Sequence, residues 1–409
     1  MNIQILKSLI ANRQSSITIT GSKSESNRLL LLQALYPNIS IENLSNSDDS
    51  VLMQKALSSE DEVIDIHHAG TAMRFLTAYF SIQEGRQITL TGSTRMKERP
   101  IGILVEALKQ LGADIQYVEN EGFPPLKIKG KKITNSKVRL KANVSSQYIS
   151  ALLLIASKLE NGLELTLEGK ITSVPYIKMT LHLLGQMGVE TVFKDNIITV
   201  KPKTTKVESQ TLVVESDWSS ASYFYSIAAL SEPDTEITLS SYKKDSLQGD
   251  AVLAKIYKQF GVSTIFKTNT IRLQKSSIVN RQSPINFDLA NAPDIAQTIA
   301  VTAFGLGLEC YLTGLHTLKI KETDRLVALK TELEKLGAEV VITNDSLHLS
   351  KSDSITEDVS IDTYNDHRMA MAFAPLGLKT TLQINDAEVV SKSYPKFWDD
   401  LSAIGFKIK

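Results

Sequence analysis

The residues best able to do chemistry stand in short polar motifs, each placed where a helix is expected to begin. The first, Gly21–Arg28 (G-S-K-S-E-S-N-R), follows an alternating segment and precedes an apolar run, which predicts a strand, a turn and a helix. Ser24 and Arg28 are four residues apart and would share the first-turn face. Hydroxyls, backbone N–H groups and the cations of Lys23 and Arg28 would then surround one point, as an anion site requires. A serine-rich helix cap with solvated basic residues is the alternative.

Five further motifs place hydroxyl groups or cations where a helix is expected to begin, and they are Gly70-Thr71, Thr91–Pro100, Ser145–Gln147, Ser173–Tyr176 and Asp217–Ser222. Arg95 stands in the predicted loop Thr91–Pro100, and a guanidinium is a natural bidentate partner of carboxylate or phosphate. Each motif alone is more typical of an ordinary helix cap or a solvated loop. Together they favour the binding of small anions at helix N-termini.

The second half of the chain supplies two carboxylates that could transfer protons, Asp294 and Glu322. Asp294 heads a segment of small and apolar residues, where a carboxylate is costly unless it is paired or functional. Lys321 and Arg325 are spaced i,i+4, which predicts that they share one face of a helix. A surface helix with internal ion pairs is the alternative. The other candidate cations of this half are Arg368, at the start of a buried-looking helix, and Lys392, in a predicted loop.

The charge balance disfavours functions that depend on a strongly charged surface. Lys and Arg number 45, and Asp and Glu number 45, so no overall field attracts nucleic acid or an anionic membrane. The longest apolar run, residues 151–156, is too short to span a bilayer, and the N-terminus lacks the pattern of a signal peptide. We therefore expect a cytoplasmic protein with neither a nucleic-acid nor a membrane partner.

The sequence predicts neither a metal centre nor a cofactor. A single cysteine, Cys310, excludes a multi-cysteine metal site, and its apolar surroundings favour a buried thiol over a nucleophile. His67 and His68 are adjacent and do not share a face, which argues against their binding one metal ion. Nucleotide-binding loops of the Walker and Rossmann types are absent.

A long internal repeat organises the chain into α/β units. Helical stretches end in an apolar residue followed by glycine, after which a strand, a polar turn and a second strand are expected. A weaker copy at 49–66 makes six units, which divide most simply into two groups of three. A single elongated array of repeats is the competing architecture. The glycines recur at intervals of about 68 to 76 residues, at Gly112, Gly188, Gly261, Gly337 and Gly405.

The motifs resemble, in type and in order, those of the 5-enolpyruvylshikimate-3-phosphate synthase family. The resemblance implies the family's α/β fold, a two-domain inside-out α/β barrel in which each domain has three βαβαββ units and a cleft separates the domains. It places the domains at 21–215 and at 1–20 plus 216–409, because the family's first strands join its C-terminal domain. The motifs run from residue 21 to beyond 392 and read G-S-K-S-E-S-N-R, A-G-T-A-M-R, R-M-K-E-R-P, S-S-Q, S-D-x-S-S-A-S-Y-F, K-E-T-D-R and Y-N-D-H-R-M-A-M.

The resemblance also implies a reaction. The family transfers the enolpyruvyl group of phosphoenolpyruvate to the 5-hydroxyl of shikimate 3-phosphate, giving 5-enolpyruvylshikimate 3-phosphate and phosphate through a tetrahedral ketal. This is a step of the shikimate pathway to aromatic amino acids. By the same resemblance we expect a monomer that acts on these small molecules without a cofactor.

Substrate-binding and catalytic residues follow from the matching motifs. Those implied for shikimate 3-phosphate are Lys23, Ser24, Arg28, Ser145, Ser146, Gln147, Ser173, Tyr176, Asp294 and Lys321. Those implied for phosphoenolpyruvate are Lys23, Gly70, Arg95, Gln147, Arg325, Arg368 and Lys392. Asp294 resembles the base that takes the proton of the 5-hydroxyl, and Glu322 the acid that protonates the methylene carbon. Lys23 is the third residue implied in catalysis.

Three positions depart from the family's pattern. His68 stands where many relatives have asparagine, and Thr317 stands where an asparagine often contacts shikimate 3-phosphate. Phe75 follows Ala-Met-Arg where proline is common, in a region that borders the glyphosate site of the family. The resemblance therefore predicts the reaction but not the response to glyphosate.

Two other functions compete with this prediction. UDP-N-acetylglucosamine enolpyruvyl transferase has the same fold and donor, but that family usually carries a cysteine in the loop that corresponds to Thr91–Pro100, where this chain has none. A non-catalytic anion-binding protein on the same scaffold would be expected to have lost acids or cations of the site. This chain has all of them, so we favour the first reaction.

Overall fold

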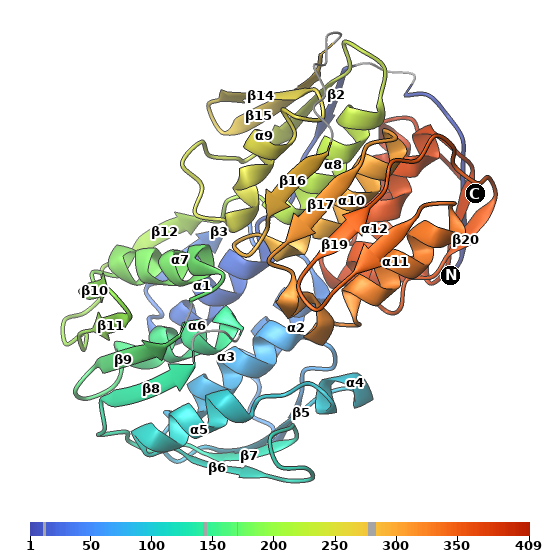
Figure 1. The fold of residues 1–409 in the computed structure, drawn as a ribbon. Helices are drawn as coiled ribbons and strands as arrows, with labels where there is room; N and C mark the ends of the chain where they lie inside the picture. Colours follow the sequence, from blue (N-terminus) through green and yellow to red (C-terminus); the bar gives the residue numbers. More distant parts are fainter. Residues whose placement is uncertain (11–13, 142–144, 170, 277–283) are drawn as a thin grey trace. The chain divides into compact units, whose positions relative to one another are not determined.

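The computed structural model describes residues 1–10, 14–141, 145–169, 171–276 and 284–409. The chain divides into two compact units, which Figure 1 shows as ribbons. The continuous unit is Gly21–Val214, and the discontinuous unit combines Met1–Thr20 with Glu215–Lys409. The chain therefore passes from one unit to the other twice.

The continuous unit contains helices α1 (Lys23–Leu35), α2 (Asp48–Ser58), α3 (Gly70–Ser81), α4 (Thr94–Lys97), α5 (Gly102–Leu111), α6 (Ser146–Ala156) and α7 (Val174–Gln186). Its strands are β3 (Ile39–Glu42), β4 (Val63–Asp65), β5 (Gln87–Thr91), β6 (Asp114–Tyr117), β7 (Leu126–Lys129), β8 (Lys137–Lys141), β9 (Leu163–Glu168), β10 (Thr191–Lys194), β11 (Ile197–Val200) and β12 (Gln210–Val213).

The discontinuous unit contains helices α8 (Trp218–Leu230), α9 (Leu253–Ile256), α10 (Ala296–Gly305), α11 (Arg325–Lys335), α12 (His367–Phe373) and α13 (Phe397–Ala403). Short 3₁₀ helices are η1 (Gly249–Val252), η2 (Pro293–Ile295), η3 (His316–Ile320), η4 (Ala374–Leu378) and η5 (Ala387–Lys392). Its strands are β1 (Ile3–Leu6), β2 (Gln14–Ile17), β13 (Glu236–Ser240), β14 (Val262–Lys267), β15 (Thr270–Lys275), β16 (Ile285–Asp288), β17 (Cys310–Thr313), β18 (Val340–Ile342), β19 (Leu347–Leu349), β20 (Val359–Ile361), β21 (Leu382–Ile384) and β22 (Lys407–Ile408).

One sheet topology recurs in both units. In every four-stranded sheet of the described residues, the first pair of strands is parallel and the next two pairs are antiparallel. The strand orders are β4-β5-β7-β6, β8-β9-β11-β10, β2-β13-β15-β14, β16-β17-β19-β18 and β20-β21-β1-β22. Strands β3 and β12 form a further parallel pair. Both N-terminal strands thus pair with strands from the second half of the chain.

The predicted repeat of glycines is confirmed by the backbone. All five glycines of the repeat have a positive φ, for example 103° at Gly112 and 95° at Gly337. Gly112 caps the C-terminus of α5, where its N–H donates to the carbonyls of Leu108 and Lys109. A left-handed residue costs little as glycine, and each of these glycines lies between the end of a helix and the start of the next strand.

Helices that are apolar on all sides form the centre of the discontinuous unit. Helices α8, α10 and α12 pack on one another, and β17 lies beside α10 (Figure 1). A helix buried on every face has few places for polar side chains, so their hydroxyls bond to one another. Thr302 of α10 donates to Ser226 of α8 at 2.8 Å, and Ser222 and Thr298 lie 3.1 Å apart. The polar motifs therefore concentrate at the helix ends.

Two segments that the sequence predicts as loops are partly helical. Residues 94–97 of the predicted loop Thr91–Pro100 form α4, because the Ser93 hydroxyl accepts from the N–H of Met96 and caps one turn. Lys392, also predicted in a loop, is the last residue of η5. Cys310 is fully buried in β17, as predicted.

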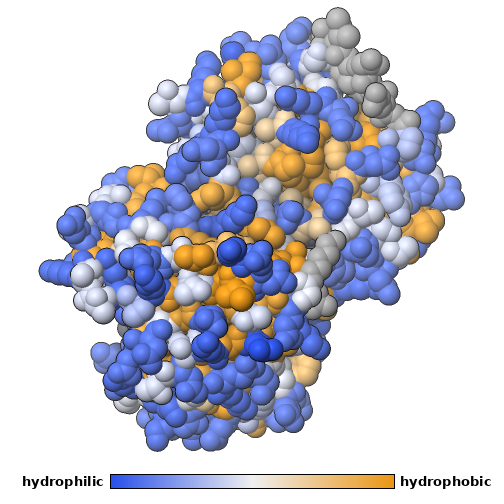
Figure 2. All heavy atoms as spheres, turned by 60° about the vertical axis from the view of Figure 1, so that its left-hand side comes forward, coloured by the Kyte–Doolittle hydropathy of each residue, from blue (hydrophilic) through white to orange (hydrophobic). Residues whose placement is uncertain are grey.

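The surface drawn in Figure 2 is mainly hydrophilic. On the face drawn in Figure 2, hydrophilic residues cover most of the area and hydrophobic residues form smaller patches between them. Across the described residues, every helix is too short or too polar to cross a membrane.

A buried carboxylate holds the segment that leads into α12. Glu332 of α11 is fully buried and accepts from the Tyr364 hydroxyl at 2.6 Å and from the N–H of Asp362 at 3.1 Å. Lys335 pairs with it at 2.8 Å. Tyr364 and Asn365 both have a positive φ, which is costly for residues with a side chain. Glu332 thus fixes a strained turn that positions the start of α12.

We expect Glu332→Gln to lower the free energy of unfolding by about 1–3 kcal/mol, because an amide cannot accept all of these bonds and leaves a buried donor unsatisfied. Glu334→Gln is the matched control on the same helix, since Glu334 is exposed and forms a surface ion pair with Lys330. That control should change stability by about 0.5 kcal/mol or less. Urea unfolding of both variants measures the effect, and equal losses would contradict the role given to Glu332.

Candidate active site

Arg28 is the buried cation at the centre of a polar cluster in the continuous unit. It extends from α1, is 2% exposed, and donates to Ser150 at 2.9 Å and Thr180 at 2.8 Å. It also donates to the carbonyl of Ser24 at 2.7 Å, so the two residues share a helix face as predicted. Burial lowers the pKa of the Arg28 guanidinium to about 10. These acceptors are neutral oxygens, which leave the positive charge available to attract an anion.

Lys23 lies in the same unit beside a pair of acidic residues. Its Nζ is 3.5 Å from Oδ2 of Asp49, which is buried at the start of α2. His68 lies 3.9 Å from Asp49 and 3.8 Å from Asp48. His68, a departure from the family's pattern, is therefore placed next to a carboxylate that also contacts Lys23. The sequence analysis did not select Asp49, although the pair Asp48-Asp49 at a helix start could have drawn attention to it.

Gly70 allows a guanidinium to approach the start of α3. A Cβ on Gly70 would lie 2.6 Å from Nη1 of Arg99, which is closer than real contacts allow. Arg99 is 8% exposed, which disfavours the alternative of a solvated loop for this residue of the motif. The structure therefore adds Arg99 to the cations of this region. Arg95, a predicted ligand, is instead half exposed on α4 and pairs with Glu98 at 3.0 Å.

The predicted motif at residues 145–147 joins two helices of the continuous unit. The Ser145 hydroxyl caps α6 by accepting from the N–H of Gln147 at 3.3 Å. The Gln147 amide donates to the Thr71 hydroxyl at 3.1 Å and so links α6 to the first turn of α3. Ser146 is buried beside them.

Ser173 and Tyr176 lie at the start of α7. Ser173 is left-handed, with φ of 54°, and its side chain caps none of the described N–H groups of that helix. The alternative of a plain helix cap is therefore wrong for Ser173. The ring of Tyr176 lies 5.8 Å from the Arg28 guanidinium, which brings this predicted residue to the Arg28 cluster.

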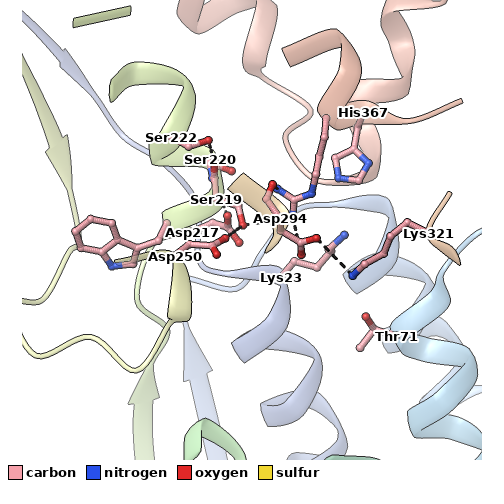
Figure 3. A network of polar contacts seen from close by, with 12 residues as sticks. Lys23, Thr71, Asp217, Ser219, Ser220, Ser222, Asp250, Asp294, Lys321 and His367 are labelled. Atoms are coloured by element: carbon pink, nitrogen blue, oxygen red, sulfur yellow. Dashed lines mark hydrogen bonds and ion pairs between the residues drawn. The ribbon is translucent and has the colours of Figure 1, made fainter. Parts of the chain in front are cut away.

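Asp294 is the centre of a second cluster, in the discontinuous unit. Its carboxylate contacts Arg325 at 2.9 Å, Arg368 at 3.2 Å and Lys321 at 3.4 Å, and Figure 3 shows Lys321 reaching it. Burial opposes the ionisation of Asp294, but the charges of Arg368, Lys321 and Arg325 outweigh it and hold the pKa of this carboxyl well below its usual range. Four predicted site residues therefore meet here.

Arg325 connects this carboxylate to two others. It is 2% exposed and contacts Asp366 at 2.6 Å and Glu322 at 2.7 Å, in addition to Asp294. Burial alone would lower its pKa, but the three carboxylates raise it above its ordinary value. The sequence analysis did not select Asp366, although an aspartate directly before a buried helix was a usable signal.

The prediction that Lys321 and Arg325 share a helix face is wrong. Helix α11 begins at Arg325, because the Asp324 side chain accepts from the N–H groups of Leu326 and Val327 and caps the helix there. Lys321 lies before it, at the end of η3. Lys321 and Arg325 reach Asp294 from separate elements, so their spacing of four residues does not place them on one face of a helix.

Arg368 lies at the start of α12, and Asp366 caps this helix by accepting from the Arg368 N–H at 2.9 Å. The Arg368 guanidinium donates to the carbonyl of Asp294 at 3.2 Å and to the Ser219 hydroxyl at 3.3 Å. Lys392 donates to the carbonyl of Asn365 at 2.6 Å, close in sequence to the same helix start.

Other chemistries find little support in the described residues. They contain no group of three or more His, Cys, Asp or Glu that could hold a metal ion. Burial raises the pKa of the Cys310 thiol to about 12, so a thiolate nucleophile is disfavoured there. The two clusters instead bring buried cations together with hydroxyl groups in one unit and with carboxylates in the other.

Comparison with known proteins gives a consistent result. The model of the family EPSP synthase (3-phosphoshikimate 1-carboxyvinyltransferase) matches residues 39–401. A 3-phosphoshikimate 1-carboxyvinyltransferase of Bacteroides fragilis is 48% identical over 401 residues, which cover 97% of this chain and 96% of that protein. The protein of the same name from Haemophilus influenzae strain KW20 is 36% identical over 426 residues, covering 96% and 97%.

Solved structures share the fold. EPSP synthase from Acinetobacter baumannii superposes with a TM-score of 0.79 at 21% identity, covering 100% of this chain and 99% of that chain. The enolpyruvyl transferase NikO from Streptomyces tendae gives a TM-score of 0.75 at 12% identity, covering 100% and 98%. These likenesses confirm the predicted fold class.

We expect Arg325→Met to lower the free energy of unfolding by about 3–5 kcal/mol at pH 7, because buried carboxylates lose their partner. Because the folded-state pKa of Asp294 is lowered, its ion pairs stabilise the folded state above the unfolded-state pKa of about 4. This stabilisation is lost as the pH falls. The difference in the free energy of unfolding between wild type and variant should therefore become smaller below about pH 4. Urea unfolding at pH 7, 5 and 3.5 measures it.

Arg272→Met is the control for this prediction, since Arg272 is partly exposed and pairs with Glu236 at 3.3 Å. It should cost about 1 kcal/mol or less at each pH. A loss in Arg325→Met that is constant across pH would show that packing, and not charge, explains the effect.

Proposed function

The chain belongs to the EPSP synthase family, and from that premise we propose how its residues perform the family's reaction. The enzyme transfers the enolpyruvyl group of phosphoenolpyruvate to the 5-hydroxyl of shikimate 3-phosphate and releases phosphate, in the shikimate pathway. Both substrates are small polyanions. The assignment of residues to them, the order of proton transfers and the ketal intermediate form the proposal.

The observation that carries the proposal is the convergence of Arg325, Arg368 and Lys321 on Asp294. The carboxylate and phosphate of phosphoenolpyruvate can replace carboxylates of the protein as partners of these cations. The same cations keep Asp294 ionised, which a base requires. They also lower its affinity for a proton, so it is too weak a base in the free enzyme.

We propose that substrate binding activates Asp294. When anionic groups of the substrate draw the guanidinium groups of Arg325 and Arg368 to themselves, the attraction that depresses the pKa of Asp294 weakens. Its basicity then rises toward the value needed to remove the proton of the 5-hydroxyl. The enzyme thus keeps its base ionised in the empty state and strengthens it in the complex.

Glu322 is proposed as the acid of the same reaction. Its carboxyl lies 2.7 Å from Arg325 and is partly exposed. Protonation of the methylene carbon makes the adjacent carbon electrophilic, and the 5-oxygen attacks that carbon to form the ketal. In the second step a methyl proton returns to a base and the carbon–oxygen bond to phosphate breaks, which restores the double bond and releases phosphate.

The remaining assignments follow the motifs. For shikimate 3-phosphate we propose Lys23, Ser24, Arg28, Ser145, Ser146, Gln147, Ser173, Tyr176, Asp294 and Lys321. For phosphoenolpyruvate we propose Lys23, Gly70, Arg95, Gln147, Arg325, Arg368 and Lys392. The buried Arg28 guanidinium, which hydrogen-bonds to neutral oxygens, supports this assignment. The Ser173 hydroxyl, which does not cap α7, also supports it. Arg95 would have to leave Glu98 to act.

We further propose that the enzyme is a cytoplasmic monomer whose domains are residues 21–215 and 1–20 plus 216–409. The two compact units, Gly21–Val214 and Met1–Thr20 with Glu215–Lys409, support these domain bounds. UDP-N-acetylglucosamine is disfavoured as acceptor, because Thr91–Pro100 contains no cysteine and the relatives named above are 3-phosphoshikimate 1-carboxyvinyltransferases.

The first measurement is phosphate release from phosphoenolpyruvate with and without shikimate 3-phosphate. We expect release only when shikimate 3-phosphate is present, because the acceptor hydroxyl must attack before phosphate can leave. A parallel reaction with UDP-N-acetylglucosamine should release none. Release with the nucleotide sugar alone would move the enzyme to the competing reaction, and no release with either acceptor would favour the non-catalytic scaffold.

We expect Asp294→Ala to lower kcat by roughly 10²–10⁴, the usual contribution of a general base. The affinity for shikimate 3-phosphate, measured by calorimetry, should change little in comparison. Asp353→Ala is the control, since the side chain of that aspartate is 85% exposed and pairs with Lys351 on the surface. Turnover close to wild type in Asp294→Ala would remove Asp294 from the role of base.

A further inference from the structure

A second buried carboxyl group lies behind Arg368 in the discontinuous unit. Asp250 belongs to η1, is 2% exposed, and has no part in the reaction described above. The Ser219 hydroxyl, on the first turn of α8, donates a short hydrogen bond to Oδ2 of Asp250. Figure 3 shows this pair next to Asp294.

The Ser219 hydroxyl connects Asp250 to Arg368. Ser219 donates to Asp250 and accepts from Nη2 of Arg368 at 3.3 Å. The same nitrogen lies 3.2 Å from Asp294. Arg368 is thus held between two acidic groups, one in direct contact and one through a hydroxyl.

Asp250 is poorly provided with partners for a buried carboxylate. Its Oδ1 is buried, and none of the described residues hydrogen-bonds to it. An ionised carboxylate in such a place is costly, because one hydroxyl does not replace the water that was lost. Burial is the largest cause that raises the pKa of Asp250, and Asp294 and Asp217 add to it. Arg368 and Ser219 oppose them, and the net effect is a pKa of about 7.

We propose that Asp250 is a positioning residue that controls, through Ser219, how strongly Arg368 attracts the anionic donor substrate. This inference rests on the proposed role of Arg368 in binding phosphoenolpyruvate. When Asp250 is neutral, Arg368 keeps its contact with Asp294 but faces one negative charge fewer, and it attracts an incoming carboxylate or phosphate more strongly. When Asp250 is ionised, a second negative charge behind Arg368 retains the guanidinium at Ser219 and repels the substrate.

The direction of the pH dependence follows from this arrangement. Phosphoenolpyruvate is an anion and binds better to the enzyme in which Asp250 carries its proton. Its KM should therefore rise as Asp250 loses that proton. By reciprocity, bound phosphoenolpyruvate favours the protonated form of Asp250. The charged groups that act on Asp250 are Asp217 before α8, Asp294 on η2 and Arg368 on α12, and they are the same in every sample compared below.

The test measures kcat and both KM values of the full-length enzyme from pH 6 to 8.5, in wild type and in Asp250→Asn. The variant cannot ionise at this position, and an amide fits the same space. The readout is the ratio of the wild-type KM for phosphoenolpyruvate to that of Asp250→Asn. We expect this ratio to rise about tenfold over this pH range, a typical size for coupling between two sites. Titration of the substrate's own phosphate cancels in this ratio. The corresponding ratio for shikimate 3-phosphate should stay within about twofold.

Two further variants sharpen the test. Asp400→Asn is the matched control, because Asp400 also has a pKa raised by burial and a hydroxyl partner, Tyr394 at 2.6 Å. The ratio of the wild-type KM for phosphoenolpyruvate to that of Asp400→Asn should not change with pH. Ser219→Ala removes the hydrogen bond that favours ionised Asp250, so the rise in KM should move to higher pH. This second variant keeps the test valid even if Asp250→Asn folds poorly.

The outcomes separate the inference from the assignment on which it rests. A ratio for Asp250→Asn that is flat with pH, together with an unmoved profile in Ser219→Ala, overturns the role of Asp250. Arg368→Gln is measured in parallel and should raise the KM for phosphoenolpyruvate at every pH. If it does not, the proposed role of Arg368 is wrong and the inference fails with it, whereas a flat ratio beside an impaired Arg368→Gln rejects the inference alone. A purely structural role of Asp250 would lower thermal stability and affect both substrates equally.

Discussion

The discontinuous unit depends on one electrostatic constraint, which is that buried cations must be matched by carboxylates before any substrate arrives. Arg325 illustrates it, since this guanidinium is almost fully buried and contacts Asp294, Glu322 and Asp366. A buried charge without a partner costs several kcal/mol. The acids proposed for catalysis therefore also balance the charge of the cations in the empty site.

The same constraint determines where helices begin. Asp366 binds Arg325 and also caps α12 by accepting from the N–H of Arg368. Asp324 caps α11 and so sets the position of Arg325 at its first turn. A helix start that is held by a carboxylate gives its neighbouring guanidinium a defined direction. In this unit, secondary structure and site geometry are thus set by the same few side chains.

Local patterns in the sequence predict the elements better than they predict the contacts. The glycines that end helices and the polar motifs that start them depend on neighbouring residues, and the structure confirms them at Gly112, Gly337 and Gly70. Ion pairs depend on which elements meet in the fold, so Asp49, Asp250, Asp366 and Arg99 were not foreseen. The helical face assigned to Lys321 and Arg325 was wrong, because the spacing of four residues also fits a turn followed by a capped helix.

The two units stabilise a buried guanidinium in different ways, and the difference has a functional meaning. Arg28 is held by a carbonyl and two hydroxyls, which orient it without cancelling its charge. Arg325 is held by three carboxylates, which cancel the charge until something displaces them. A cation of the first kind can attract a phosphate directly. A cation of the second kind binds an anion only by loosening its hold on an acid, and this exchange links substrate binding at Arg325 to the basicity of Asp294.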